Sequence, residues 1–235
     1  MKKKWIVVTG GSRGIGRAIV EKFTSNGFNA VVCGRNFPDL EALKDEIEQK
    51  QDVQVLIKST DLAIKEEVKD FCEFVLKYIE SPAVLVNNAG VFVPGAVHDE
   101  QEGVLEKMMK TNVYSAYHIT RALLPAMKSA KQGHIFNMCS TASIIPYVNG
   151  GSYCITKFAL LGFSKVLREE LKETGIKVTA VLPGATHTDS WKGVDIPEER
   201  FMKPEDVAET VYGAYALSER AVIEEILMRP QLGDI

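Results

Sequence analysis

A glycine-rich turn near the start of the chain joins a short apolar run to a segment with helical spacing. The apolar run, Trp5-Ile6-Val7-Val8, is typical of a buried strand, and residues 17–23 have the periodicity of a helix. Glycines let a backbone approach a ligand closely, and the free N–H groups and dipole of a helix N-terminus attract phosphate. The turn therefore predicts a dinucleotide pyrophosphate site, made by Gly10, Ser12, Arg13, Gly14, Ile15 and Gly16.

The spacing of this turn, Gly-x-x-x-Gly-x-Gly, differs from the Gly-x-Gly-x-x-Gly of the standard dinucleotide fingerprint. A glycine-rich turn without any ligand is the alternative, but three glycines at a strand–helix junction favour the phosphate site.

Strand-like and helix-like segments alternate along the whole chain. We expect strands at 4–9, 30–34, 53–58, 83–87, 134–139, 177–182 and 221–227, and helices at 14–26, 38–50, 64–80, 100–129, 151–174 and 204–217. Pro125 should kink or end the fourth of these helices. The alternation predicts an α/β fold, a doubly wound parallel sheet of about seven strands with helices on both faces. No linker or repeat interrupts it, so residues 1–235 are expected to form a single domain.

Composition excludes several classes of function. A net charge of −3 and a pI near 5.9 argue against a general nucleic-acid surface. No apolar run approaches the ~18 residues of a membrane span, so we expect no membrane partner. Lys2-Lys3-Lys4 imitates the start of a signal peptide, but the apolar run after it ends at Gly10 without a small-residue cleavage site.

The cysteines and histidines indicate neither disulfides nor a metal. They lack Cys-x-x-Cys spacing or clustering, and they stand at Cys33, Cys72, Cys139, Cys154, His98, His118, His134 and His187. Reduced, buried thiols in a cytoplasmic protein are the expectation, and no metal site is assigned.

A tyrosine and a lysine stand four residues apart, at Tyr153 and Lys157, and Ser140 lies thirteen residues before the tyrosine. Residues at i and i+4 share a helix face, so the ammonium can lie beside the phenol. The positive charge stabilises the phenolate, which makes the phenol a good proton donor near neutral pH, as carbonyl reduction requires. A Tyr-x-x-x-Lys pair also arises by chance, and its weight comes from the cofactor turn that precedes it.

Taken together, these motifs resemble those of the short-chain dehydrogenase/reductase family. They follow in order over nearly the whole chain: Thr9 to Gly16, Asp61-Leu62, Asn87-Asn88-Ala89-Gly90, Asn112, Ser140, Tyr153 with Lys157, and Pro183-Gly184 through Thr188. Each block is short, and their joint order and spacing carry the resemblance. It implies a Rossmann-type fold and an oxidoreductase that uses a nicotinamide cofactor.

The resemblance also implies individual roles. Tyr153 donates a proton to the carbonyl oxygen, Ser140 holds that oxygen, and Lys157 binds the nicotinamide ribose. Asn112 bends its helix and holds a water that connects Lys157 to solvent. Further implied cofactor contacts are Asp61 on the adenine, the backbone of Leu62, the small segment Asn88, Ala89 and Gly90 beside the adenosine, Pro183, Gly184, and Thr188 on the nicotinamide carboxamide.

Three positions have structural alternatives. Asp61 equally suits the N-cap of the helix that follows residue 63. Asn87 fits a structural hydrogen-bonding role better than a cofactor contact. Ser143 is only ten residues from Tyr153, a separation that does not match the family, so Ser140 is preferred.

Charge at the end of the second predicted strand favours NADP(H) over NAD(H). An acid there would bond a free ribose 2′-hydroxyl and repel a 2′-phosphate. The strand instead ends at Gly34-Arg35-Asn36, and Asp39 lies past Pro38. Arg35 and Arg13 offer guanidinium groups suited to phosphate, and basic residues at these places accompany NADP(H) in the resembled family. The alternative is that both arginines are solvated surface residues.

The least regular stretch, 184–203, follows the sixth predicted strand, so it is the expected substrate lid. It is short, which implies an open cleft, and Trp191, Val194 and Ile196 suggest apolar contact. The last strand lacks the Asp-Gly-Gly ending of similar acyl-carrier ketoreductases and looks more like that of carbonyl reductases or sepiapterin-reductase-like members.

We therefore expect NADP(H)-dependent reduction of a small-molecule ketone or aldehyde to an alcohol. Reduction of a 3-ketoacyl thioester and NAD-dependent alcohol oxidation are alternatives within the enzymes. A non-catalytic NADP(H)-binding redox sensor or scaffold is the alternative from another class. Non-catalytic relatives typically lose the tyrosine or the lysine, so the presence of Ser140, Tyr153, Lys157 and Asn112 favours the enzyme.

The segments 113–129 and 152–172 carry more apolar residues than one buried helix stripe requires. In the resembled family this pair of helices packs against its symmetry mate as a four-helix bundle, a two-fold contact. A homodimer is the expectation, or a homotetramer if the last strand also pairs.

Overall fold

The structure is a computed structural model that describes residues 3–191 and 193–235. The strands are β1 (Trp5–Thr9), β2 (Asn29–Gly34), β3 (Val55–Ser59), β4 (Val84–Asn87), β5 (Gly133–Met138), β6 (Ile176–Pro183) and β7 (Glu225–Met228). The α-helices are α1 (Gly14–Ser25), α2 (Phe37–Lys50), α3 (Lys65–Tyr78), α4 (Val104–Met109), α5 (Ser115–Ala130), α6 (Gly151–Leu171) and α7 (Pro204–Tyr215). The predicted alternation of strands and helices is confirmed.

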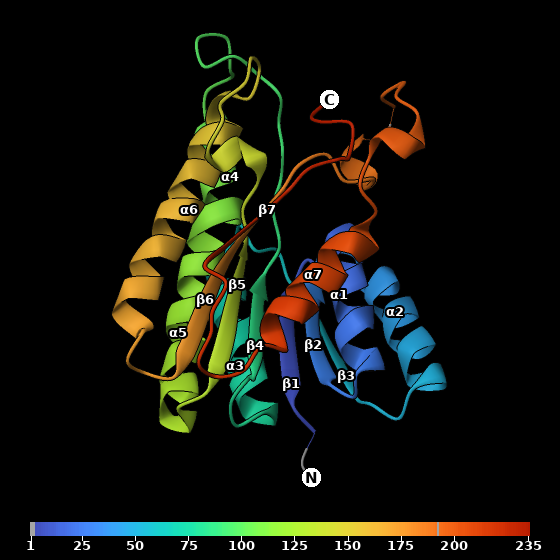
Figure 1. Cartoon of the computed structure of the whole chain (residues 1–235), viewed down its shortest axis with the longest axis vertical. Helices are drawn as coiled ribbons and strands as arrows, with labels where there is room; N and C mark the ends of the chain where they lie inside the picture. The colour runs from blue at the N-terminus through green and yellow to red at the C-terminus, as the bar shows by residue number, and fades with distance from the viewer. Residues whose placement is uncertain (1–2, 192) are drawn as a thin grey trace.

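All seven strands join one parallel sheet in the order β3-β2-β1-β4-β5-β6-β7 (Figure 1). Central strand β1 pairs on both edges, with Val7 opposite Val31 of β2 and opposite Leu85 of β4. The chain winds outward from β1 in one direction and outward from β4 in the other. Open sheets of this kind bind ligands where the order reverses, at the carboxyl ends of the strands.

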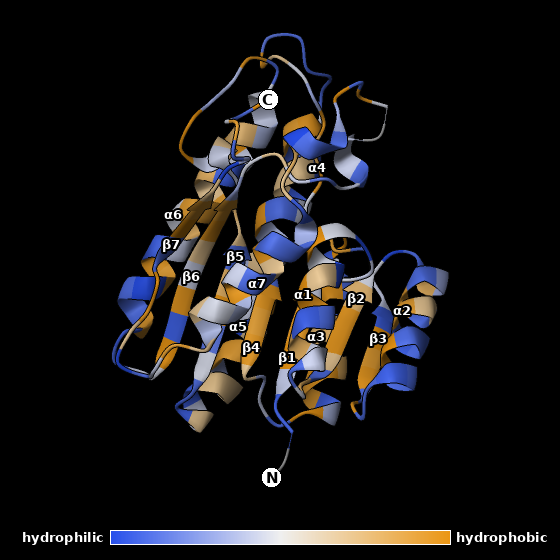
Figure 2. Ribbon diagram, turned by 45° about the vertical axis from the view of Figure 1, so that its right-hand side comes forward, coloured by the Kyte–Doolittle hydropathy of each residue, from blue (hydrophilic) through white to orange (hydrophobic). Residues whose placement is uncertain are grey.

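The two faces of the sheet bury separate cores. Ile6 and Val8 of β1 pack with residues of α1, α2 and α7, whereas Val7, between them, packs with residues of α3, α5 and α6. This alternation follows from the two-residue period of a strand. Because both faces are covered, the central strands are apolar over most of their length (Figure 2).

The predicted helix at 100–129 is wrong as a single element. Residues 104–109 form α4, Lys110–Tyr114 adopt a π-helical turn, and α5 begins at Ser115. Pro125 does not end α5, which continues to Ala130. The proline is exposed, so water can reach the carbonyl of Arg121 that it leaves without an N–H donor. The last strand is also shorter than expected, since only residues 225–228 pair with β6.

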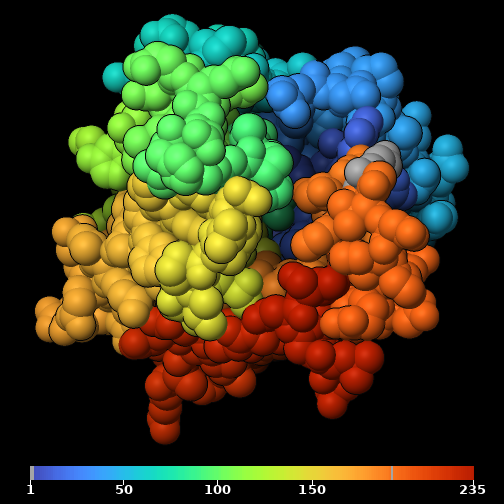
Figure 3. All heavy atoms as spheres, turned by 90° about the horizontal axis from the view of Figure 1, so that it is seen from above, coloured from blue at the N-terminus to red at the C-terminus, as the bar shows by residue number. Residues whose placement is uncertain are grey.

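The carboxyl ends of the strands lie together at the top of the molecule in Figure 1. Seen from above, a hollow opens between the green and yellow segments on one side and the orange segment on the other (Figure 3). The green segment follows β4, the yellow one follows β5 and the orange one follows β6. The hollow therefore lies where the reversal of strand order predicts a ligand.

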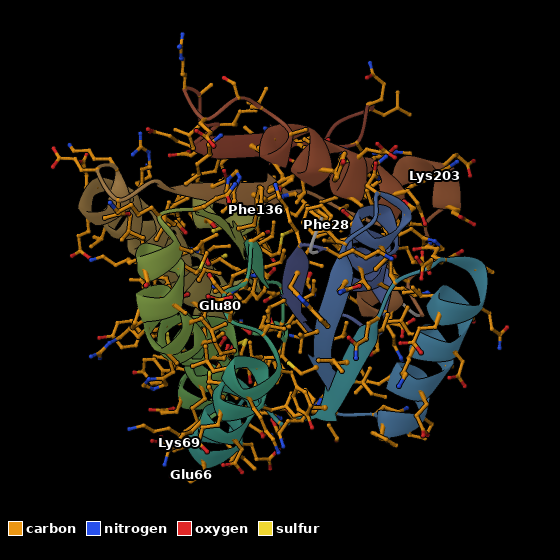
Figure 4. The ribbon with its side chains drawn as sticks, turned by 90° about the horizontal axis from the view of Figure 1, so that it is seen from below. Phe28, Glu66, Lys69, Glu80, Phe136 and Lys203 are labelled. Atoms are coloured by element: carbon orange, nitrogen blue, oxygen red, sulfur yellow. The ribbon has the colours of Figure 1, made fainter. Side chains whose placement is uncertain are left out.

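The opposite end is seen in Figure 4, where Phe28 and Phe136 are labelled. Both belong to the core under α7, and Phe28 makes an edge-to-face contact with Tyr215, with 5.3 Å between the ring centroids. Full burial of one such side chain contributes about 1.5–3 kcal/mol. These contacts stabilise the end of the molecule opposite the hollow.

Candidate active site

The glycine turn between β1 and α1 forms one side of the hollow. Gly10 has a φ of +62°, a left-handed conformation that glycine adopts without steric cost. A Cβ at Gly16 would collide with the carbonyl oxygen of Gly10 and with the Asn88 amide. Arg13 is the N-cap of α1 and supplies no side-chain hydrogen bond to it. The N–H groups of the first helical turn are therefore available to an anion.

Asn88 fixes this turn to the end of β4. Its Nδ2 donates to the carbonyl oxygens of Thr9 and Gly10 at 2.9 and 3.0 Å. In return, Thr9 Oγ1 accepts the backbone N–H groups of Asn88 and Ala89, each at 3.0 Å. Asn88 thus holds the glycine turn as well as facing the cavity. Asn87, as expected, is buried and donates from Nδ2 to Asn137 and Thr120.

One cavity of about 1300 Å³ runs across the carboxyl ends of the strands. Among the predicted site residues it is lined by Gly10, Ser12, Arg13, Gly14, Ile15, Gly16, Arg35, Asn36, Asp61, Leu62, Asn88, Ala89, Gly90, Ser140, Tyr153, Lys157, Pro183, Gly184 and Thr188. Asn112 is the predicted site residue that does not line it. A single continuous groove thus joins the turn, the arginines and the Ser-Tyr-Lys group.

The two candidate serines have different surroundings. Ser140 faces the cavity at the end of β5, where its Oγ accepts the N–H of Ala142 at 3.1 Å. Ser143 is fully buried, and its Oγ accepts the N–H of Ser140 at 3.2 Å. Ser143 therefore supports the turn that presents Ser140.

Tyr153 and Lys157 lie on adjacent turns of α6. The Lys157 Nζ is 5.6 Å from the centroid of the Tyr153 ring. Lys157 is 5% exposed, and its ammonium donates to the carbonyl oxygen of Met138 at 2.7 Å. A buried ammonium needs such a partner because desolvation disfavours the charge. A Cβ on Gly90 would lie 3.6 Å from this Nζ, so the glycine keeps the loop after β4 close to the lysine.

Asn112 sits in the π-helical turn behind the cavity wall and is 1% exposed. Its Oδ1 accepts the N–H of Val91 at 2.7 Å, and its Nδ2 donates to Val91 O and to Thr156 Oγ1 at 2.9 and 3.0 Å. These bonds tie the loop after β4 to α6 beside Lys157. π-helical turns inside longer helices are frequent at functional sites.

The two arginines differ in their partners. Arg13 forms ion pairs with Asp39 and with Asp189, at 2.6 and 3.1 Å. Asp39, which follows the end of β2 in the sequence, lines the cavity and pairs with Arg13 there. Arg35 is exposed and forms no ion pair within residues 3–191 and 193–235. Arg35 is the more available of the two for a phosphate.

Two other predicted residues have defined contacts. Asp61 does not cap α3, whose N-cap is Ile64; its Oδ1 instead accepts the N–H of Ala63 at 2.9 Å. The helix begins at Lys65, one residue later than expected, and Asp61 lies outside its first turn. Thr188, on the lid, lies against the glycine turn, since a Cβ on Gly14 would be 3.0 Å from its Cγ2.

Sequence reasoning missed residues on the loops around Tyr153. The Phe92 ring packs edge-to-face on the Tyr153 ring, with 4.9 Å between centroids. Tyr147 also lines the cavity, and burial, with smaller contributions from Tyr153 and Cys154, raises the pKa of its phenol. Both residues lie in irregular segments, where no periodicity marks them. Their closeness in sequence to the predicted site residues Gly90 and Ser140 was the signal that could have identified them.

Glu100 was missed as well. Its carboxylate accepts the N–H of Ser152 at 2.8 Å and the Ser152 hydroxyl, so it caps the first turn of α6. The same loop is fixed by the N–H of Gly95, which donates to Asn149 O at 2.9 Å. The segments after β4 and after β5 thus form one wall of the cavity. Glu100 in this wall caps α6, the helix that carries Tyr153.

No group of three or more potential metal-ligating side chains gathers among residues 3–191 and 193–235. Over the same residues, no helix is long and apolar enough to cross a membrane. All four cysteines are buried with free thiols.

The family model described as short chain dehydrogenase matches residues 4–199 of this chain. The chain therefore belongs to the short-chain dehydrogenase family of oxidoreductases, as the motifs suggested.

Individual relatives match the chain over almost its full length. Sepiapterin reductase of Chlorobaculum tepidum is 32% identical over 241 residues, covering 99% of this chain and 98% of the relative. A metagenomic short-chain oxidoreductase solved in complex with NADP is 32% identical, with a TM-score of 0.85 and 97% of each chain covered. The closed form of a serine dehydrogenase complexed with NADP+ is 30% identical, with a TM-score of 0.88, covering 98% of this chain and 96% of that one.

Proposed function

We propose that this protein is an NADP(H)-dependent oxidoreductase that reduces a ketone or aldehyde to an alcohol. The observation that carries the proposal is the single cavity in which Ser140, Tyr153 and Lys157 meet a phosphate-binding turn and two arginines. A nicotinamide cofactor bound along this groove would place its phosphates at the glycine turn and the arginines. Its nicotinamide ring would lie beside Ser140, Tyr153 and Lys157.

The residues present fit such a cofactor. The glycine turn forms a cradle that a Cβ at Gly16 would fill, and the first turn of α1 offers N–H groups to a pyrophosphate. Asp61 and Leu62 line the part of the cavity proposed for the adenine, and Arg35 with Arg13 the part proposed for the 2′-phosphate. Solved relatives with NADP bound are similar over 97–98% of this chain.

The proposed reaction divides its work among four side chains. When bound, NADPH would supply the hydride that reduces the carbonyl carbon. Ser140 donates a hydrogen bond to the carbonyl oxygen and orients it. The Tyr153 phenol gives its proton to that oxygen, so the C=O bond becomes CH–OH. Lys157 would hold the nicotinamide ribose and stabilise the phenolate left behind. Asn112 ties the loop after β4 to α6 beside the lysine and, as the family resemblance implies, would connect the lysine to solvent through a water.

We also propose a cytoplasmic homodimer, or a homotetramer if β7 pairs across a second two-fold axis. Large apolar side chains remain exposed along the outer faces of α5 and α6: Tyr117, Ile155, Phe158 and Val166. A self-complementary two-fold contact would cover this face on both subunits.

A panel of ketones, aldehydes, quinones and acyl thioesters tests the reaction. We expect loss of NADPH absorbance and formation of the matching alcohol with at least one carbonyl class, and slower turnover with NADH. NADPH binding without turnover of any class would instead favour a redox sensor or scaffold.

A further inference from the structure

Tyr153 lies in the first turn of α6, close to the point where the helix begins. Gly150 is the N-cap, and as a glycine it has no side chain that could accept the free N–H groups of that turn. Helix ends open more readily than helix interiors. Lys157 lies one turn further in, where its buried ammonium donates to Met138 O. The position of the phenol relative to the ammonium therefore depends on whether the first turn of α6 stays closed.

A carboxylate from a distant segment supplies the missing cap. Glu100, in the segment after β4, accepts the N–H of Ser152 on Oε1 at 2.8 Å, and its Oε2 accepts the Ser152 hydroxyl. The helix dipole also favours a negative charge at this end of α6. Ser152 directly precedes Tyr153 and is 2% exposed, so water competes little for its N–H and hydroxyl groups. Glu100 thus holds the backbone on the N-terminal side of the tyrosine.

Two glycines make room for this carboxylate. A Cβ on Gly95 would lie 2.7 Å from Glu100 Cγ, and a Cβ on Gly151 would collide with Glu100 Oε1 and with Gly95 O. The N–H of Gly95 donates to Asn149 O at 2.9 Å, which joins the segment after β4 to the residues that lead into α6. The half-buried Glu100 side chain is therefore enclosed by the two segments that it connects.

Other contacts restrain the rest of Tyr153. The Phe92 ring, from the same segment as Glu100, packs on the Tyr153 ring with 4.9 Å between centroids. The Tyr153 carbonyl oxygen accepts the Thr156 hydroxyl at 2.8 Å. The ring and the carbonyl group thus have their own partners, and the cap by Glu100 completes the set on the side where the helix begins.

We propose that Glu100 is a positioning residue for the reaction: by closing the first turn of α6, it holds the Tyr153 phenol where it gives its proton to the substrate. The proposal rests on the proposed function for the role of Tyr153. It goes beyond that function because Glu100 acts through Ser152 and is not among the described residues that line the cavity.

Two substitutions of Glu100 separate its geometry from its charge. Glutamine can accept the Ser152 N–H and donate to the Ser152 hydroxyl oxygen, so Glu100→Gln keeps two hydrogen bonds, whereas Glu100→Ala keeps neither. At saturating NADPH and ketone, Glu100→Ala should lower kcat about tenfold or more, because a small misplacement of a reacting group is costly. Glu100→Gln should retain about a third of the wild-type kcat or more. An equal loss in both variants would overturn the positioning role.

Asp99 provides the matched control for these substitutions. Its side chain is 76% exposed, one residue before Glu100 in the same segment. Asp99→Ala removes a carboxylate without uncapping α6, so its kcat should equal that of wild type. A loss in Asp99→Ala as large as in Glu100→Ala would assign the effect to the charge of the segment and overturn the proposal.

Cofactor binding distinguishes positioning from general damage to the fold. Lys157, the proposed ribose contact, is held in the second turn of α6 by Met138 O. The dissociation constant for NADPH, measured by fluorescence titration, should therefore change less than about threefold in Glu100→Ala. Ser152→Ala should lower kcat further in wild type than in Glu100→Ala, where the hydroxyl has already lost its partner. Equal losses of NADPH affinity and of kcat in Glu100→Ala would contradict the proposal.

A readout besides activity keeps the proposal separate from the proposed function. With isotope-labelled tyrosine in the protein, Tyr153→Phe identifies the NMR signal of the Tyr153 ring. Glu100→Ala should shift or broaden this signal and speed hydrogen exchange at the amides of residues 152–154 about tenfold or more, whereas Glu100→Gln should leave both as in wild type.

The two failures are distinguishable. If wild-type protein reduces no carbonyl compound while the signal and the exchange rates change in Glu100→Ala, the proposed function fails and the placement of Tyr153 by Glu100 stands. If wild-type protein reduces a carbonyl compound and Glu100→Ala keeps the wild-type kcat, the proposed function stands and the positioning role of Glu100 fails.

Discussion

The ammonium of Lys157 lies 5.6 Å from the centroid of the Tyr153 ring, one turn further along α6. The lysine is buried, and its ammonium donates a hydrogen bond to the carbonyl oxygen of Met138 rather than to a carboxylate. Because this partner is neutral, the positive charge of Lys157 is not cancelled. The charge therefore acts on the Tyr153 phenol and on a ligand bound beside it.

Lys157→Ala should therefore weaken NADPH binding and lower kcat, because the cofactor loses its proposed ribose contact and the phenolate loses its stabilising charge. Fluorescence titration of NADPH and kcat measured at saturating NADPH test the two effects separately. Lys165→Ala is the matched control, since Lys165 is an exposed lysine of the same helix paired with Glu225. Loss of binding with an unchanged kcat at saturating NADPH would leave the lysine only a ribose contact.

Arg35→Asp should reverse the cofactor preference towards NADH. The change removes a cation from the proposed 2′-phosphate site and adds a carboxylate that repels phosphate and accepts the ribose hydroxyl. Because Arg13 already binds Asp39 and Asp189, Arg13→Ala should weaken NADPH binding less than Arg35→Ala does. Dissociation constants and kcat/KM for both cofactors measure this, with Lys69→Glu on α3 as a control. A wild-type preference for NADH would refute the assignment.

His134 should make the fold sensitive to acid. It is 2% exposed, its Nε2 shares a hydrogen bond with Thr179, and burial lowers its pKa from 6.5 to about 3. A histidine with a lowered pKa contributes stability above its unfolded pKa, and that contribution is lost as pH falls from about 6.5 towards 3. Its part of the unfolding free energy should fall by about 2 kcal/mol between pH 7 and pH 5.

Urea unfolding of His134→Gln should accordingly show a smaller loss of stability over this pH range than wild type. His98→Gln should follow wild type, because His98 is exposed. Parallel pH dependence of His134→Gln and wild type would remove His134 as the cause.

Phe158→Glu should convert the proposed dimer to a monomer. Phe158 is 45% exposed on the outer face of α6, and a carboxylate in the centre of an apolar two-fold contact would face its own copy. Light scattering at micromolar concentration should give a dimer or tetramer for wild type and for Leu76→Glu on α3. A monomeric wild type would contradict the assembly.

The sheet and its helices were predictable because strand and helix periods in this sequence are strong and agree with the glycine turns between them. The π-helical turn at Lys110–Tyr114 was not, since a shift of backbone hydrogen bonds depends on what Asn112 contacts in other segments. Sequence spacing identified Ser140, Tyr153 and Lys157 as one group, and the structure places them on one cavity.

What escaped prediction depends on contacts between distant segments. Glu100 caps a helix 52 residues later, and Arg13 pairs with Asp189 across 176 residues. Neither contact produces a local sequence pattern, because each depends on how the loops pack against one another above the sheet.

The most direct test of the account is hydride transfer from NADPH to a ketone in wild type and in Tyr153→Phe. The phenylalanine keeps the ring that packs on Phe92 but has no proton to give, so turnover should fall by a factor of about 10² or more while NADPH binds as in wild type. Retention of more than about a tenth of wild-type turnover by Tyr153→Phe would contradict its role as the proton donor.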